Sequence, residues 1–540
     1  MSPTIISAVV ISAYFAFMMA IGWAGRLRAN GSADFLLAGR SLGPVLYCST
    51  MGALVIGGGS TVGGVGLGFQ HGLSGMWMVV AIGFGAAGVS LLLAGRIRRL
   101  QIYTIAEMLK LRYGIEAAGW SGLVMVAHVF LVSVTSTVAY ATVFSALFGL
   151  GHVQSSLLGG AVVVGYCVLG GMWSISVTDL VQFLMKTVAV FFLLLPAALR
   201  ASGGLAGAQQ KFHGRAFDPF AIGWEQILTF FVLYSVGSLV SQDLWQRAAT
   251  ARSAAVARWA GAVSGLYCLA YGVAVAVIGL AGALVRPELK PGQVYGQLAV
   301  SLLPPVLSAL VLAGAMAAMM STSSGSIIAA ATVARRDVVP LLGPAWRSAS
   351  SRRPSRAGLV PRRFRTPRRG APGNSSTWDS PGEVAPGADE SGATEVRLDR
   401  RYVLAFGLAN VLLSCFIDNV LAALSVGYSI VVGALIVPVF GGFLWKRATG
   451  AGALAAMGAG SAGAVAELLR TGSPEAITPV YLGLACSAVV FVVVGLATEP
   501  TPEKVLREWE ARLASDDGAS DGHDAGSASE RSTADRVAGT

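Results

Sequence analysis

Repeated apolar runs of about twenty residues dominate the sequence and constrain its fold more than any other feature. A helical run of this length spans the hydrocarbon core of a bilayer. Of the 540 residues, 54% are hydrophobic and only 12% are charged. That balance leaves too little polar surface for a water-soluble chain of this size. The chain is therefore predicted to be an all-α membrane protein embedded in a lipid bilayer.

About thirteen transmembrane helices are predicted. The first is expected to be a retained span, because neither a basic n-region nor a clear small-residue cleavage site accompanies it. The longest runs are expected to tilt or to break. The predicted spans are approximately 3–24, 44–69, 74–95, 119–148, 155–171, 175–199, 224–245, 257–285, 301–331, 402–418, 420–444, 449–469 and 478–497.

The basic residues between the spans predict the orientation. With the N-terminus outside, 32 of the 39 lysines and arginines fall on the cytoplasmic side and six fall outside, while Lys186 lies within a span. Such a bias is the usual orientation signal of a multi-pass protein. The prediction is a cell (inner) membrane protein with its C-terminus in the cytoplasm. Because the charge follows the membrane boundaries, no nucleic-acid partner is expected.

The composition divides the chain into four parts. Residues 1–334 carry spans one to nine, and residues 401–498 carry spans ten to thirteen. Between them, residues 335–400 are rich in Arg, Pro, Ser and Gly, whereas residues 499–540 are acidic and rich in small residues. Neither segment can bury a core, so both are predicted to be disordered and cytoplasmic.

A glycine-rich run, residues 57–66, lies in the second span. It lacks the Lys of a phosphate-binding loop and the strand that precedes a dinucleotide site. One interpretation is a seam where helices pack closely. The other is an interrupted helix whose free carbonyls bind a cation and whose half-helix ends bind a solute. Glycine alone does not decide between the two.

A second run, residues 321–326, places five hydroxyls within six residues of the ninth span. These hydroxyls could donate back to carbonyls of the preceding turn. Alternatively, Ser321 and Thr322 could offer hard oxygen ligands to a small cation such as Na⁺. The residues leave both interpretations open.

Taken together, six stretches in order along residues 34 to about 450 resemble the sodium:solute symporter family. The stretches are 34–43, 57–66, 103–108, 170–179, 246–247 and the run from Ser321. The resemblance implies a leucine-transporter-type fold of two inverted five-helix repeats, the first at about 44–199 and the second starting near 224. It also implies Na⁺-coupled symport of a small organic solute by alternating access, without enzymatic chemistry. The solute would be of the organic acid, amino acid, vitamin or amine type.

The resemblance also implies site residues. The Na⁺ ligands would be the carbonyls of Ala53, Ile56 and Ala318 and the hydroxyls of Ser321 and Thr322. The solute pocket would involve Ser60, Thr61, Tyr234, Gly237, Ser238 and Gln242. Asp179 matches an acid near the sodium exit path of the family, although an Asp is equally expected at a helix start. The several amides and the bulky aromatic gate that line a sugar site in this family are missing, so a sugar is disfavoured as the solute.

Two further charged residues lie in predicted spans. Asp243 could attract a cation, but an ion pair with Arg247 one turn later is favoured. Lys186 shares a helix face with Asp179 and Gln182. It could lie near the cation route and modulate it, by repelling Na⁺ or by exchanging a proton with it, or it could snorkel to the cytoplasmic side. Both possibilities stay open.

Other functions are weighed against Na⁺ symport. A proton-coupled transporter of the same fold and a transporter-derived sensor are the alternatives, although a sensor would need a folded cytoplasmic domain. A channel is disfavoured because no polar pattern repeats across the spans. An intramembrane enzyme is disfavoured because no paired His/Glu or Ser/His/Asp set lies within them. His128, inside a span, is predicted to be a hydrogen-bonded packing residue.

Overall fold

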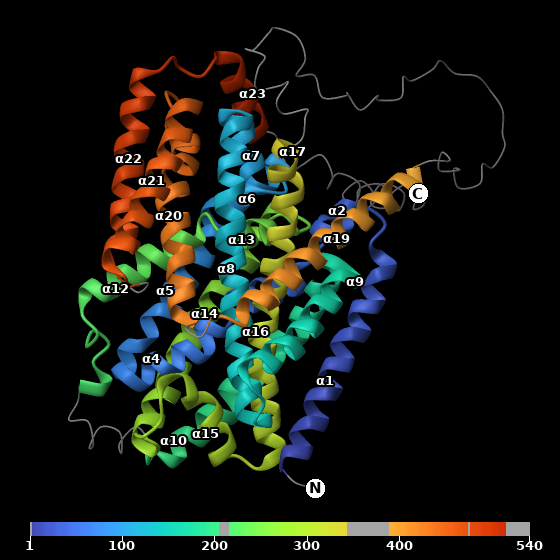
Figure 1. The fold of residues 1–540 in the computed structure, drawn as a ribbon, viewed down its shortest axis with the longest axis vertical. Helices are drawn as coiled ribbons and strands as arrows, with labels where there is room; N and C mark the ends of the chain where they lie inside the picture. The colour runs from blue at the N-terminus through green and yellow to red at the C-terminus, as the bar shows by residue number, and fades with distance from the viewer. Residues whose placement is uncertain (1–2, 205–214, 343–387, 418–419, 474–475, 515–540) are drawn as a thin grey trace, which may run out of the picture.

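The computed structural model describes residues 3–204, 215–342, 388–417, 420–473 and 476–514. Every named element in this part of the chain is a helix, and the only β pairing described is an isolated bridge between Leu42 and Ala251. Figure 1 shows an elongated bundle whose main helices run roughly along its long axis. The predicted all-α class is confirmed.

Nine helical stretches of the described chain are long and apolar enough to cross a membrane. They are fewer than the predicted spans because some predicted spans are joined and others are broken. The fifth and sixth follow each other without a loop in α9 (His152–Thr187), which η6 (Val188–Leu194) and α10 (Leu195–Ala201) extend, but the backbone leaves the helical conformation at Gly171 and divides α9 in two. The break predicted between the two spans therefore lies at Gly171, whose φ of 58° is readily adopted by glycine.

Two of the predicted spans are interrupted, and each begins one of the predicted repeats. The second span divides into α3 (Pro44–Val55) and, after a π-helical turn η3 (Gly59–Gly63), α4 (Gly64–His71). The seventh divides into α12 (Trp224–Phe230) with η8 (Phe231–Val236), and then α13 (Gln242–Ala248). The interrupted-helix interpretation of the glycine run is therefore correct at the end of α3.

The packing interpretation of the same run also holds, a few residues further on. Helix α4 crosses α14 (Ala254–Val285) at backbone contact distance. A Cβ added at Gly68 would lie 2.4 Å from the carbonyl oxygen of Ala276, and one at Gly279 would lie 2.1 Å from that of Val65. Only glycine permits so close an approach, as in other small-residue seams between membrane helices.

The centre of the bundle is α16 (Pro305–Val333), around which the other helices pack. Every residue from Val311 to Ala334 is buried. Helix α16 contacts α8 (Ile115–Phe148), α9, α3 and α1 (Pro3–Gly25). The hydroxyl run that starts at Ser321 therefore faces protein on all sides rather than lipid.

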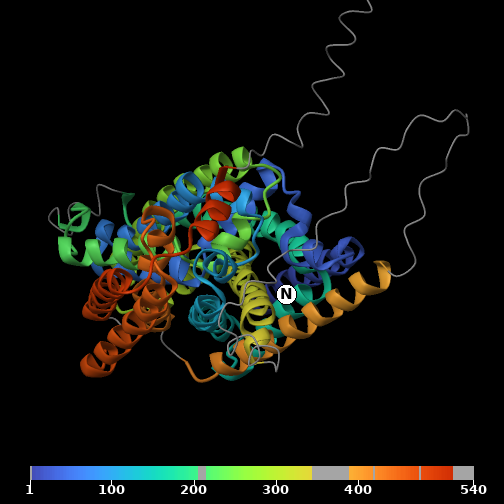
Figure 2. The ribbon, with the colours of Figure 1, turned by 90° about the horizontal axis from the view of Figure 1, so that it is seen from above.

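The outer helices carry the apolar surface that a bilayer would cover. In Figure 2, α21 (Gly450–Thr471) and α22 (Thr478–Ala497), drawn in orange-red, lie at one edge of the bundle, and α1 lies on the opposite side. The valines of α22, Val489, Val492 and Val493, are exposed. Contiguous exposed apolar side chains of this kind mark a surface that meets lipid.

Three α-helices lie in or extend into segments predicted to be disordered, and the first is α17 (Val339–Leu342), near the start of the basic linker. Helix α19 (Ala388–Ser414) starts within the basic linker, and α23 (Glu503–Ala514) lies within the acidic tail. Trp509 of α23 is buried with its ring 5.5 Å from that of Phe443. The prediction of disorder from composition is wrong for α23, because a single buried aromatic side chain is enough to hold a short amphipathic helix against the bundle. Residues 343–387 and 515–540 of the two predicted disordered segments lie outside the described residues.

Elements predicted to share a side of the membrane lie at the same end of the bundle. In Figure 1, α7 (Ile105–Tyr113), α17 (Val339–Leu342) and α23 lie at the top. The start of α1, α10 and α15 (Val294–Leu302) lie at the bottom. The alternation of loops predicted from the basic residues therefore agrees with the fold.

Candidate ion and solute site

The interruption after α3 leaves backbone carbonyls without their helical partners. A helix that ends at Val55 has no following turn to satisfy its last four carbonyl groups. Three carbonyl oxygens around this point converge on one cation, the ammonium of Lys186. The Nζ atom lies 3.1 Å from Gly52 O, 2.9 Å from Ala53 O and 3.2 Å from Ile56 O. Lys186 is completely buried.

The hydroxyl run of α16 meets the same interruption from the other side. The Ser321 hydroxyl donates to Ala53 O and to Ala318 O, at 2.8 Å each. The Thr322 hydroxyl donates to Leu54 O at 2.6 Å and more distantly to Ala318 O. The residues predicted to bind Na⁺ are thus brought together, with Ile56 joined to the others through Lys186. Their role as Na⁺ ligands stays a prediction.

Lys186 does not snorkel. Its Nζ points across to α3 inside the bundle, and Asp179 and Gln182 on the same face of α9 are also fully buried. Of the two possibilities left open by the sequence, snorkelling is wrong, and the ammonium is buried beside Ala53 O and Ile56 O, two of the predicted Na⁺ ligands. An ammonium has three N–H donors, and the three carbonyls satisfy all of them.

Asp179 forms a buried ion pair with Arg247 of α13. The carboxylate Oδ2 lies 3.0 Å from Arg247 Nη2, and both side chains are at most 1% exposed. Thr50 of α3 donates its hydroxyl to the same carboxylate oxygen. Asp179 lies well inside α9, so the interpretation as a helix start is wrong. The predicted pair between Asp243 and Arg247 is also wrong, because Arg247 points to α9 instead.

Asp243 instead lines a small central cavity of about 40 Å³ next to the interruption. Its Oδ1 accepts from Ser241 Oγ at 2.5 Å and from the backbone N–H of Leu244, and its Oδ2 accepts from Ser326 Oγ at 3.2 Å. Among the ion pairs of the described residues, none involves Asp243. Among the described residues, the hydrogen-bond donors to this buried carboxylate are all neutral.

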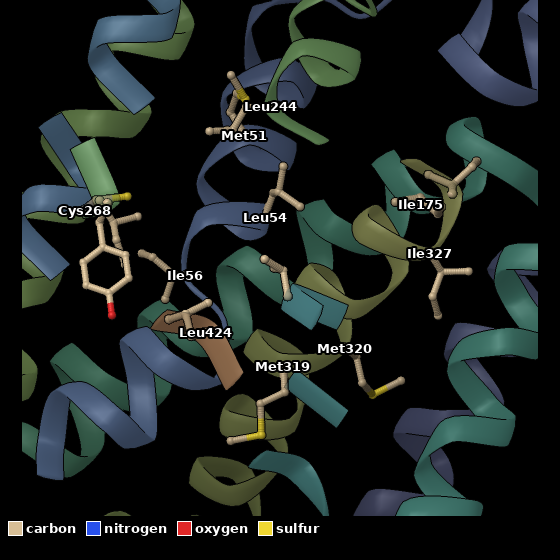
Figure 3. Packing of buried hydrophobic residues seen from close by; sticks show 14 of the residues in the cluster. Met51, Leu54, Ile56, Ile175, Leu244, Cys268, Met319, Met320, Ile327 and Leu424 are labelled. Atoms are coloured by element: carbon tan, nitrogen blue, oxygen red, sulfur yellow. The ribbon is translucent and has the colours of Figure 1, made fainter. Parts of the chain in front are cut away.

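The cavity wall comes from six helices, which are α3 with the turn that follows it, α5 (Trp77–Gly88), α8, α13, α16 and α20 (Val420–Leu444). Figure 3 shows Leu54 of α3, Leu244 of α13 and Leu424 of α20 among the apolar side chains at this point. Thr322 of α16 also lines the cavity, so the candidate ion ligands and the cavity share a wall. The polar and aromatic side chains in the lining are Ser60, Thr135, Ser136, Asp243, Thr322 and Tyr428.

Of the six residues predicted to bind solute, the structure brings only Ser60 to this cavity. Thr61 hydrogen-bonds Tyr271, and Tyr234 lines a separate cavity of about 390 Å³. Gly237 packs on Tyr428. Ser238 lies against Gly85. Gln242 accepts from Ile105 N and donates to Tyr103 O, which ties α13 to α7.

Sequence reasoning missed the contribution of α8 and α20 to the cavity. Thr135, Ser136 and Tyr428 belong to long apolar helices and carry no local pattern that sets them apart. His128 of α8 lies behind this wall, with Nε2 3.1 Å from Ser241 Oγ and its ring packed edge-on against Tyr428. The predicted packing role of His128 is confirmed.

Known proteins resemble this chain over most of its length. The profile of the sodium:solute symporter family matches residues 35–345. The osmoregulated proline transporter OpuE of Bacillus subtilis is 29% identical over 241 residues, covering 43% of this chain and 47% of that protein. The sodium/proline symporter of Staphylococcus aureus is 24% identical over 360 residues, covering 62% and 68%. The chain thus spans about half the length of the first relative and two thirds of the second.

A solved structure agrees with the fold. A Na⁺-coupled sialic acid symporter in a substrate-bound, outward-open state superposes with a TM-score of 0.71 at 15% sequence identity, covering 92% of this chain and 99% of the other. This likeness confirms the predicted leucine-transporter-type architecture. With the profile match over more than half of its residues, the chain belongs to the sodium:solute symporter family, whose members are transporters and not enzymes.

Proposed function

We propose that the protein is a Na⁺-coupled symporter that moves a small organic solute across the cell membrane by alternating access. One observation carries the proposal: the carbonyls freed at the end of α3 and the hydroxyls of Ser321 and Thr322 meet beside the central cavity. Neutral oxygen donors of this kind suit a singly charged hard cation. A shared wall between ion site and cavity gives one ligand a physical means to affect the other.

The direct test is uptake into proteoliposomes with and without an inward Na⁺ gradient. L-Proline is the first solute to try, because both curated relatives are named for it. We expect accumulation that collapses when Na⁺ is equal on both sides. Accumulation driven by a proton gradient alone would favour the proton-coupled alternative instead.

The cavity also supports a class of solute. A buried carboxylate without a cationic partner is costly, and a bound positive charge would offset that cost. Asp243 is 6% exposed, lines the cavity and takes part in no ion pair among the described residues. We infer that the solute carries an ammonium group, as amino acids do, and that Asp243 receives it.

The coupling site makes a testable prediction at Thr322. Replacing Thr322 with Ala removes the hydroxyl that reaches Leu54 O, whereas Ser keeps it. Loss of one oxygen ligand is expected to cost about 1–3 kcal/mol, which raises the half-maximal Na⁺ concentration about 5- to 150-fold. Thr322→Ser should stay close to wild type. A Na⁺ dependence equal to that of wild type in both variants would exclude Thr322 from the ion site.

The proposed orientation has the N-terminus outside and the C-terminus in the cytoplasm. Cysteine labelling or reporter fusions within residues 360–390 should report the cytoplasm, because a segment this basic is retained on that side. A fusion in the loop between α14 and α15 serves as the matched control and should report the outside. Labelling of 360–390 from outside would invert the assignment.

A further inference from the structure

The ammonium of Lys186 lies where the coupling cation is proposed to bind. Two of its three acceptors, Ala53 O and Ile56 O, are the backbone ligands predicted for Na⁺. The side chain reaches them from α9, which packs against α3. Within the described residues Lys186 forms no ion pair. The carboxylate on its own helix face, Asp179, is paired with Arg247 instead.

The site suits an ammonium for the same reasons that it suits Na⁺. Both carry one positive charge, and both are stabilised by several carbonyl oxygens. The two cations cannot share these oxygens. Unit charges a few ångströms apart in a buried site repel each other by several times the thermal energy. Occupation by Lys186 and occupation by Na⁺ therefore exclude each other.

We propose that Lys186 is a tethered cation that competes with Na⁺ at the interruption of α3. In the arrangement described here the ammonium holds the carbonyls of Gly52, Ala53 and Ile56 together. Na⁺ binds only when the lysine side chain withdraws, so Lys186 sets the Na⁺ concentration at which the site fills. This inference rests on the proposed function for its physiological meaning, but the competition is a property of the protein that can be measured without transport.

The test is a Na⁺ titration of the purified full-length protein, read as thermal stabilisation in detergent at constant ionic strength. Lys186→Met keeps the length of the side chain and removes the competitor. The half-maximal Na⁺ concentration should fall about 10- to 150-fold, the range for losing one charged hydrogen-bonded group. Lys186→Arg keeps a positive charge and should bind Na⁺ no better than wild type. Lys290→Met removes an exposed lysine from the loop between α14 and α15 and serves as the charge-matched control.

The outcomes separate this inference from the proposed function. Uptake that requires Na⁺ in wild type, with tighter Na⁺ binding in Lys186→Met, supports both. Uptake that ignores Na⁺ in wild type, with Na⁺ binding gained in Lys186→Met, supports the competition and overturns Na⁺ coupling. Unchanged or weaker Na⁺ binding in Lys186→Met overturns the competition, whatever the uptake data show.

A measurement on wild type covers the case in which Lys186→Met does not fold. The chain has six lysines. Labelling with ¹³Cε-lysine should therefore give a small set of resolved signals. Na⁺, but not N-methylglucamine, should shift the signal of Lys186, identified by its absence in Lys186→Arg. A Lys186 signal that is insensitive to saturating Na⁺ would contradict displacement of the ammonium.

Discussion

Replacing Arg247 with Met is expected to destabilise the protein by about 3–5 kcal/mol, because it leaves the carboxylate of Asp179 buried without a counter-charge. The two side chains pair at 3.0 Å and are almost fully buried. The pair joins α9 to α13, and Thr50 adds α3 to it. The expected readouts are a lower melting temperature and a smaller yield of monodisperse protein in detergent.

A second change separates loss of the pair from loss of packing. Arg247→Met combined with Asp179→Asn removes both charges and should recover much of the stability. Arg258→Met, an exposed arginine on α14, is the control and should stay near wild type. If the double variant is no more stable than Arg247→Met alone, the unpaired carboxylate is not the cause.

Replacing Asp243 with Asn should reduce uptake of an ammonium solute by about 30-fold or more, the range of about 2–5 kcal/mol for truncating one partner of a buried charge pair. The amide keeps the shape and can still accept from Ser241 and Leu244 N. The proposed partner, the ammonium of the solute, loses its counter-charge. The measurement is concentration-dependent uptake of L-proline, or of the amine solute found by screening.

A matched pair of solutes makes this test specific. Tetrahydrofuran-2-carboxylate has the ring of proline with oxygen in place of the ammonium. It should compete poorly with L-proline for uptake by the wild-type protein. The Asp243→Asn variant should lose most of the preference for the amine. Glu467→Gln makes the same chemical change on α21, away from the cavity, and should leave uptake unchanged. An undiminished preference for the amine in Asp243→Asn would exclude Asp243 from solute recognition.

Local patterns in the sequence predicted the parts of the site that depend on local chemistry. Consecutive glycines predict the interruption near Gly57, because glycine loses more conformational freedom than any other residue when it is held in a helix. Five hydroxyls in an apolar span indicated a polar face, and the structure places Ser321 and Thr322 against α3. The boundary predicted between the fifth and sixth spans falls at Gly171, where the backbone leaves the helical conformation.

Contacts between helices that are far apart in the sequence could not be predicted from such local patterns. Spacing by one turn favoured an ion pair between Asp243 and Arg247, but α13 is a short helix and Arg247 extends to Asp179 on α9. Asp243, at its first turn, points into the cavity instead. The contribution of Tyr428 depends on how α20 packs on the first half, and no spacing within one helix contains that information. Burial of Lys186 likewise depends on a contact between helices, because the carbonyl oxygens that accept from its ammonium lie near the end of α3.

Helix α23 has a mechanical consequence for the cytoplasmic end of the molecule. It packs on α6 (Ala94–Leu100) and α7 of the first half, and Trp509 and Glu510 reach Phe443 and Lys446 of the second. The helix therefore connects two parts of the molecule that the proposed alternating access would move apart. If the proposed mechanism separates the two parts at this end, α23 has to release one of its two sets of contacts, and the strength of the weaker set then contributes to the barrier for inward opening.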